Sequence, residues 1–284
     1  MDEKRKIAIV CNKLAGGGRS IQYSLQLLTA LQSKKIRVQL HTESWPQHFN
    51  GFTDVWIVGG DGTLNYFINK YPEIKLPLVV FNGGTGNDVF SILYKEKNPE
   101  ELVEIGLNAE SKPVDAGRCN DRLFLNGVGI GFEGAVAKRL EGKRKTKSGK
   151  AAFMGTILQK IFFYRSKTYR IILNNSQTER TCLLISIMNG KRAGGGFHIA
   201  PESEVDDGLL DIVMVDKLHP FQRLKCLPVI EKGAHLKLSF IKHIKSAKII
   251  ITSEIPMDAH LDGEYYSANR YEIEVLPAKF LFRY

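Results

Sequence analysis

Three glycine clusters, each close behind an apolar run, constrain this 284-residue chain more than any other feature of its sequence. The runs are KIAIVCN (6–12), VWIVGG (55–60) and LPLVVFN (76–82), and the clusters lie within residues 16–18, 59–62 and 83–86. Continuous apolar runs separated by segments of helical periodicity predict a parallel sheet that helices cover on both faces. Ligands bind beyond the carboxyl ends of such strands, so we expect the three loops to line one site.

The pattern changes at about residue 118, where most segments become strand-like. Helical candidates interrupt these strands at about 151–164 and 220–232. Successive strands with few intervening helices favour an antiparallel sheet. We therefore predict an α/β parallel-sheet domain over residues 1–117 and a β-rich domain, an antiparallel sandwich, over residues 118–275.

The chain has a formal net charge of +10, which favours anionic partners. Its densest basic run, residues 138–150, has seven Lys or Arg against one Glu, a pattern that fits an anionic membrane surface or a solvated loop. Few aromatic residues interleave with these charges, so we expect no nucleic-acid partner. No segment resembles a signal peptide or approaches the roughly 20 apolar residues of a membrane span. These features predict a cytoplasmic protein with peripheral membrane contact.

The loop GGDGTLN (59–65) suggests phosphate binding. Gly59, Gly60 and Gly62 would permit positive φ and let a ligand approach the main chain, and Thr63 would cap the next helix or donate to a phosphate oxygen. Asp61 would be repelled by phosphate unless a cation such as Mg²⁺ lay between them. The alternative is an ordinary tight turn.

The loop GGTGND (83–88) repeats this chemistry after the next strand, with glycines, Thr85 and Asp88. Neither loop matches the GxxxxGK[ST] pattern of a P-loop. The first strand is not followed by GxGxxG, and the next predicted strand along the chain, RVQLHT (37–42), ends at Thr42, where a dinucleotide site would have an acidic residue. The repetition favours a shared phosphate site over two unrelated turns.

Several blocks, in order along nearly the whole chain, resemble the diacylglycerol kinase catalytic domain family, which includes bacterial lipid kinases and sphingosine kinases. Two are the glycine loops just described. The others are VDAGRCNDRLFLNGVGIGFEGAVAK (114–138), ESEVDDGLLDIV (202–213) and LDGEYY (261–266). GGDGT also occurs in NAD kinases and phosphofructokinases, whereas GGTGND followed by a late DGE is more selective for lipid kinases.

The resemblance implies two domains with ATP and Mg²⁺ in the cleft between them, and a final strand, about residues 276–284, that returns to the first domain. One departure is CNKLAGGG (11–18), where Lys13 replaces the family's usual proline. Carried over by motif, the nucleotide site comprises Asn12, Thr42, Gly59, Gly60, Asp61, Gly62, Thr63, Asn65, Thr85, Gly86, Asn87 and Asp88.

The resemblance also implies a mechanism for phosphoryl transfer, which depends mainly on positioning and charge neutralisation. Asp61 would bind Mg²⁺ through water, with Asp88 and Asp115 in the same network. Asp262 of the DGE motif would be the general base for a lipid hydroxyl, supported by Glu264. An Asp-Gly hairpin turn is the structural alternative for Asp262.

A second Mg²⁺, structural in role, is implied in the DDGLL segment. Its ligands would be the Asp207 side chain and the carbonyls of Glu204 and Leu209, and a turn before the next strand is the alternative. His198 and His260 have no metal-ligand partner at useful spacing, and we interpret both as structural.

The sequence thus predicts an ATP- and Mg²⁺-dependent kinase that phosphorylates a lipid hydroxyl, with diacylglycerol or a related lipid alcohol as acceptor. Two alternatives stay open: an NAD kinase, and a non-catalytic nucleotide- or lipid-binding protein of the same fold. Generic apolar residues line lipid pockets, so the sequence leaves the acceptor open. A homodimer is compatible with the sequence but not required by it.

Overall fold

The computed structural model describes residues 5–84, 86–141 and 149–284. Two parts of the sequence predictions lie outside these described residues: Thr85, and residues 142–148 of the basic run. The internal contacts divide the chain into two compact units. Unit 1 comprises Met1–Val114 with Ala278–Tyr284, and unit 2 comprises Asp115–Pro277.

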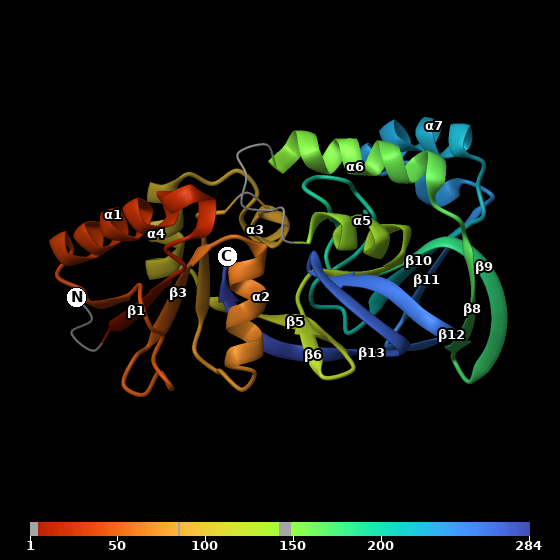
Figure 1. The fold of residues 1–284 in the computed structure, drawn as a ribbon. Coiled ribbons are helices and arrows are strands. Elements are labelled where there is room, and N and C mark those ends of the chain that lie inside the picture. Colours follow the sequence, from red (N-terminus) through yellow and green to blue (C-terminus); the bar gives the residue numbers. More distant parts are fainter. Residues whose placement is uncertain (1–4, 85, 142–148) are drawn as a thin grey trace. The chain divides into compact units, whose positions relative to one another are not determined.

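Unit 1 alternates strands and helices (Figure 1). Its elements are β1 (Lys6–Cys11), η1 (Ala15–Gly18), α1 (Arg19–Ser33), β2 (Arg37–His41), β3 (Asp54–Gly59), α2 (Asp61–Lys70), β4 (Leu78–Asn82), α3 (Asp88–Tyr94) and α4 (Pro99–Asn108). β5 (Ser111–Cys119) then continues into unit 2, and the end of β13 (Glu264–Arg283) belongs to unit 1.

The sheet of unit 1 is parallel, with strand order β2-β1-β3-β4. All six residues of β3 are buried, which explains why its sequence is continuously apolar rather than alternating. The chain's last strand extends this sheet, because Phe282 pairs in parallel with Leu78 of β4. A segment about 200 residues away in sequence thus joins the sheet edge beside β4.

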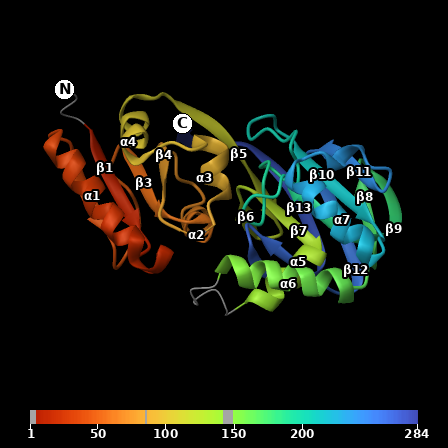
Figure 2. The same ribbon diagram turned by 90° about the horizontal axis from the view of Figure 1, so that it is seen from above.

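Helices cover both faces of this sheet, with α1 and α4 on one face and α2 on the other (Figures 1 and 2). Trp56 and Phe81 form the apolar surface under α1 and α4. Gly106 of α4 lies directly against the Trp56 ring, where a Cβ would come within 2.7 Å. The sequence analysis missed α4, although Asn98 and Glu101 form a capping box at its start.

Unit 2 consists mostly of strands, with three α-helices among its described residues. Its elements after β5 are β6 (Arg122–Phe124), β7 (Gly127–Gly131), α5 (Phe132–Leu140), α6 (Gly149–Phe163), β8 (Lys167–Leu173), β9 (Ser176–Met188), β10 (Leu210–Asp216), α7 (Pro220–Glu231), η2 (His235–Lys237), β11 (Ile241–Ser246), β12 (Lys248–Leu261) and the first part of β13.

The described strand pairs within unit 2 are antiparallel. The long strands β9 and β12 each pair with β8 through one part and with β7 through another. The sheet therefore folds over on itself and encloses an apolar core. This core includes Phe124, Ile185, Ile212, Ile251 and Tyr271.

Helices α6 and α7 occur close to where the sequence predicts them, but α5 was missed. Gly134 lies within α5 and touches the backbone of Asp258, so that any Cβ there would overlap it. A glycine inside a nine-residue helix lowers the helical propensity of the segment. The glycine that allows α5 to pack closely on β12 thus weakens the propensity signal from which this helix could be predicted.

Candidate active site

The site residues expected in unit 1 gather at the carboxyl edge of its parallel sheet. Asn12 follows β1, Thr42 follows β2, and the two glycine loops follow β3 and β4. The chain passes from β1 to β2 on one side and then to β3 on the other, so β1 and β3 flank the point where the strand order reverses. Open α/β sheets bind ligands outside such a point.

The glycines of these loops pack against each other, backbone on backbone. A Cβ on Gly60 would lie 2.7 Å from the carbonyl oxygen of Gly86, and a Cβ on Gly84 would overlap the backbone of Gly60. Similarly, Gly16 touches the carbonyl of Gly83 and adopts φ of 60°. Close packing of the three loops therefore already excludes side chains at these positions.

The expectation of positive φ at Gly59, Gly60 and Gly62 was wrong, because none of them is among the glycines with positive φ. Gly59 is instead required by Thr63, whose side chain a Cβ at Gly59 would overlap. Here glycine is required by close approach rather than by backbone conformation.

Asp61 holds the two glycine loops together. Its carboxylate accepts the backbone N–H of Asp88 at 3.0 Å and that of Val89 at 3.2 Å, at the start of α3. Its own N–H donates to the Gly86 carbonyl at 3.1 Å. The single carboxylate among the glycines thus stabilises the amino end of a neighbouring helix, where negative charge is favourable.

Thr63 lies beneath the loop, inside the helix that the loop begins. The helix α2 starts at Asp61 and its N-cap is Gly60, so it begins before the Thr63 that the sequence analysis expected to cap it. Thr63 is therefore not a capping residue; its buried hydroxyl accepts the Asn12 side-chain N–H at 3.2 Å. This hydrogen bond ties the end of β1 to the first turn of α2.

Asn87 and Thr42 lie at the same edge, and Asn65 lies within α2. Asn87 is the N-cap of α3, and its buried amide oxygen has no hydrogen-bond partner among the described residues. Such an oxygen can accept a donor from a ligand or a bound water. Thr42 is half-buried directly after β2, and Asn65 lies in α2 with its carbonyl accepting from Asn69.

The DGE motif of unit 2 forms the turn between β12 and β13. Asp262 and Gly263 are its two central residues, with φ of 46° and 84°. The Asp262 carboxylate accepts the backbone N–H groups of Leu125, Asn126 and Gly127, each at 2.9 Å. The Asp-Gly turn named as the structural alternative is present, and the Asp262 side chain fastens this hairpin to the segment before β7. Glu264, two residues on, is exposed.

Asp115 belongs to unit 2, whereas Asp61 and Asp88 belong to unit 1. Its side chain is buried and accepts the Gly208 N–H at 2.8 Å, while its own N–H donates to the Val205 carbonyl. Asp115 thus orders the DDGLL segment.

The expected metal site at Asp207 does not fit the arrangement found there. One oxygen of the Asp207 carboxylate accepts the Leu209 N–H at 3.0 Å, and the other accepts the Lys245 ammonium at 2.6 Å. The same ammonium lies 3.6 Å from Asp211. The hydrogen bond to Asp207 raises the pKa of Lys245, which favours its charged form. The positive charge beside Asp207 is therefore the protein's own Lys245 ammonium, and we call it the internal cation. Among the described residues, no group of three or more His, Cys, Asp or Glu is arranged to hold a metal.

Helices α6 and α7 present an exposed apolar surface that the sequence analysis did not identify. Phe162 of α6 and Phe221 of α7 meet edge to face, with ring centroids 6.3 Å apart. The buried Arg223 joins the helices, because it donates to the carbonyls of Ile161 and Tyr164. We call the exposed apolar set the α6–α7 surface: Met154, Leu158, Phe162, Phe163, Phe221 and Leu224.

Family models match both parts of the chain. The model described as diacylglycerol kinase catalytic domain matches residues 6–119, and the model described as YegS C-terminal NAD kinase beta sandwich-like domain matches residues 126–281. The second match alone covers more than half of the chain. The fold is therefore a catalytic domain of the diacylglycerol kinase type followed by a β sandwich-like domain.

Individual relatives agree with this assignment. A protein named "Probable lipid kinase YegS-like" from Shewanella frigidimarina is 28% identical over 233 residues, 80% of this chain and 75% of that protein. A "Diacylglycerol kinase" from Mycobacterium tuberculosis is 24% identical over 291 residues, 96% of this chain and 93% of that protein. The solved structure of a diacylglycerol kinase from Bacillus anthracis shares the fold, with a TM-score of 0.79 at 24% identity over 100% of this chain and 98% of that one. The resemblance found in the motifs is thus confirmed, and the chain belongs to the diacylglycerol kinase catalytic domain family.

Proposed function

We propose that this protein is an ATP- and Mg²⁺-dependent kinase that transfers the γ-phosphate of ATP to the hydroxyl of diacylglycerol or a related lipid alcohol. The observation that carries the proposal is the packing of the glycine loops at the carboxyl edge of the unit 1 sheet. Relatives named as lipid and diacylglycerol kinases support a lipid kinase at the level of the family.

The ATP phosphates would lie against residues 59–65, at the amino end of α2. Backbone N–H groups at a helix start, with the helix dipole behind them, favour phosphate. Asn12 and Thr63 hold this turn in place through their mutual hydrogen bond. The amide oxygen of Asn87, which has no hydrogen-bond partner among the described residues, would accept a donor from the nucleotide or from a bound water. Thr42, Thr85 and Asn65 complete the proposed nucleotide site.

Asp61 and Asp88 are the residues of unit 1 that fit Mg²⁺, and Asp115 of unit 2 is proposed for the same network. The Asp61 oxygens already accept two backbone N–H groups, so contact through water fits them better than direct coordination. Mg²⁺, when bound with ATP, supplies neutralisation of the charge on the transferred phosphoryl group.

The proton of the attacking lipid hydroxyl would pass to a carboxylate of the DGE turn, while the hydroxyl oxygen bonds to the γ-phosphorus and ADP leaves. Asp262 was the expected acceptor, with Glu264 in support. Both carboxylates stay proposed for this proton transfer: that of Asp262, which three backbone N–H groups hold in place, and that of the exposed Glu264.

The lipid acceptor would be taken from an anionic membrane surface to which the protein binds peripherally. None of the helices within the described residues has the length and apolar character to cross a bilayer. The α6–α7 surface is apolar, and residues 142–165 contain no Asp or Glu. Apolar side chains combined with basic ones are typical of segments that lie in the membrane interface.

The first test is transfer of label from γ-labelled ATP, with Mg²⁺, to mixed micelles that contain diacylglycerol, phosphatidylglycerol, a sphingoid base or a polyprenol, with NAD as a separate acceptor. Label in one lipid supports the proposal, whereas label in NAD alone would establish the NAD kinase alternative. ATP binding without transfer to any acceptor would favour a non-catalytic binding protein. Glu264→Gln should abolish transfer and leave ATP affinity unchanged, whereas Asp262→Asn should also lower the melting temperature.

Membrane contact is tested by sedimentation with phosphatidylglycerol vesicles and with phosphatidylcholine vesicles. Phe162→Ser and Phe221→Ser should each reduce binding to the anionic vesicles. Ile255→Ser, which removes an exposed apolar residue of β12, is the matched control and should bind as the wild type does. Equal losses in all three variants would argue against a specific α6–α7 contact.

A further inference from the structure

Three neighbouring strands of unit 2 place a glycine between two polar residues. Gly129 of β7 lies opposite His260 of β12 and opposite Ser186 of β9. Directly opposed residues of antiparallel strands project from the same face of the sheet. Gly129 therefore leaves a gap in the row, with His260 on one side and Ser186 on the other.

Glu133, in the first turn of α5, fills this gap. One oxygen of its carboxylate accepts the Ser186 hydroxyl at 2.6 Å, and the other lies 3.1 Å from Nε2 of His260. A Cβ on Gly129 would overlap the Glu133 side chain and would also crowd the imidazole. The glycine is thus explained by the carboxylate that lies over it.

The hydrogen bonds of His260 determine its tautomer. Its Nδ1 accepts the backbone N–H of Gly263 at 3.2 Å, so the ring proton is on Nε2, where it is donated to Glu133. Both ring nitrogens are therefore engaged, and the imidazole has no nitrogen left to take a proton from a substrate. Its role is to hold a backbone group.

The group that His260 holds lies at the centre of the DGE turn. Gly263 separates the two carboxylates proposed for proton transfer, and the Asp262 side chain fastens the same turn to the N–H groups before β7. Two sets of hydrogen bonds thus fix the turn, one through Asp262 and one through the main chain of Gly263. Carboxylates that act in proton transfer need this kind of fixed support.

We propose that Glu133 and His260 are positioning residues for the DGE turn, with Ser186 orienting Glu133, Glu133 orienting His260 and His260 holding the Gly263 N–H. This inference rests on the proposed function, because it gives the turn a catalytic task. The sequence analysis interpreted His260 as structural without identifying its partner, and it missed Glu133 and Ser186. The one sequence signal for these residues is Gly129. The reason for a glycine there, the space taken by the Glu133 side chain, becomes visible only when the strands are paired.

A matched pair of substitutions separates positioning from simple packing. An Asn side chain places an oxygen close to the position of Nδ1, whereas a Gln side chain reaches the position of Nε2. His260→Asn therefore keeps an acceptor for the Gly263 N–H, and His260→Gln keeps only the group that faces Glu133. We expect His260→Gln to lower kcat about 100-fold with the KM for ATP unchanged, and His260→Asn to stay within about threefold of the wild type.

Amide exchange and ring nitrogen shifts test the contact without any activity. The ¹⁵N shifts of His260 should report the Nε2–H tautomer, and the Gly263 amide should exchange at least about tenfold faster in His260→Gln than in His260→Asn. Equal exchange and equal kcat in the two variants would overturn the inference. If the wild type phosphorylates no lipid, the proposed function fails, and protection of the Gly263 amide still decides whether His260 holds the turn.

Discussion

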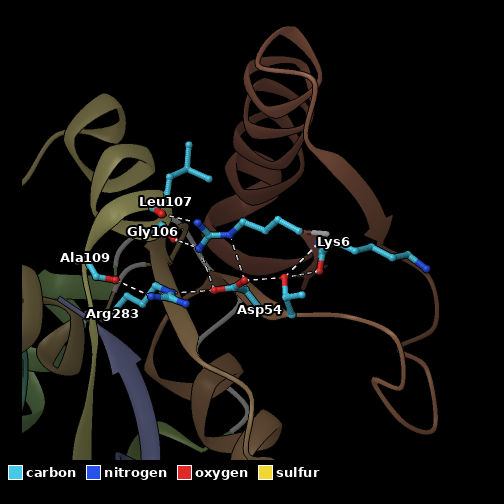
Figure 3. A network of polar contacts seen from close by, with 8 residues as sticks. Lys6, Asp54, Gly106, Leu107, Ala109 and Arg283 are labelled. Carbon is cyan, nitrogen blue, oxygen red and sulfur yellow. Dashed lines mark hydrogen bonds and ion pairs between the residues drawn. The ribbon is translucent and has the colours of Figure 1, made fainter. Parts of the chain in front are cut away.

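Replacing Asp54 should lower the free energy of unfolding of unit 1 far more than replacing an exposed charged residue does. Asp54 is 1% exposed and lies at the start of β3, where Arg5 and Arg283 converge on its carboxylate (Figure 3). Arg5 donates through Nε at 3.2 Å and Nη2 at 3.0 Å, and Arg283 donates through Nε at 2.7 Å. The Thr53 hydroxyl also donates to the Asp54 carboxylate, at 2.7 Å.

The two arginines also link Asp54 to α4 and to the end of the chain. Arg5 donates to the carbonyls of Gly106 and Leu107, and Arg283 donates to the carbonyl of Ala109 (Figure 3). The Asp54 carboxylate thus compensates two guanidinium groups that are only 15% and 20% exposed. Asp54→Asn would leave this charge without its partner.

The expected loss follows from burial. Breaking a buried ion pair by removing one partner costs about 3–5 kcal/mol, and the residual exposure of the arginines favours the lower end, about 3 kcal/mol. Arg283→Met leaves the Arg5 pair intact and should cost about 1.5–3 kcal/mol. The double variant should cost clearly less than both losses together, because Arg283 acts through Asp54.

Urea unfolding followed by tryptophan fluorescence measures this loss in unit 1, because Trp45 and Trp56 both belong to that unit. Lys34→Met is the control: it removes an ion pair with Glu104 in which both side chains are about half exposed, and should cost at most about 1 kcal/mol. An Asp54→Asn midpoint no lower than that of Lys34→Met would refute the reasoning. Additive losses in the double variant would refute the link between β3 and the last strand.

Two further predictions concern internal charge in unit 2. In the absence of ATP, the melting temperature of the wild type should not depend on Mg²⁺ or chelator, whereas Lys245→Met should lose about 1.5–3 kcal/mol and then be stabilised by Mg²⁺. A drop in the melting temperature of the ATP-free wild type with chelator would contradict the idea that the Lys245 ammonium takes the place of a metal at Asp207. Burial, with a smaller contribution from His243 and His198, lowers the pKa of His235 below its ordinary 6.5, so the unfolded state binds more protons and stability should fall as pH decreases below 6.5. In His235→Gln, which can still donate to the Ile199 carbonyl, this part of the pH dependence of urea unfolding should disappear.

The parallel sheet of unit 1 could be predicted because its signal is local. Each buried strand is a continuous apolar run, and the glycine clusters mark where the chain turns at the carboxyl edge. The motifs near Asp61 and Asp262 could likewise be found, since each is a short contiguous string of residues. The segments that were missed have weaker local signals, as in α5, where Gly134 lowers helical propensity in order to pack on β12.

The supporting residues of the site could not be predicted because their partners are far away in sequence. Glu133 and His260 are 127 residues apart, and Asp262 is 137 residues from Leu125. Lys245 and Asp207 are 38 residues apart, so the expected metal at Asp207 was proposed without knowledge of the internal cation. Only strand pairing brings such side chains together.

The glycine loops show how the same residues satisfy two requirements. The sequence suggested that ligand approach excludes side chains from GGDG and GGTG, whereas the structure shows the loops excluding side chains from each other. The two requirements are compatible, because loops that pack backbone on backbone hold their N–H groups in fixed positions before the proposed phosphate would bind. Fixed donors need no rearrangement during phosphoryl transfer, which is the main way that a protein lowers the barrier of this reaction. Under the proposed function, Asp61 would contribute in the same way: its carboxylate already holds the start of α3, so its orientation toward the loop does not depend on a bound metal.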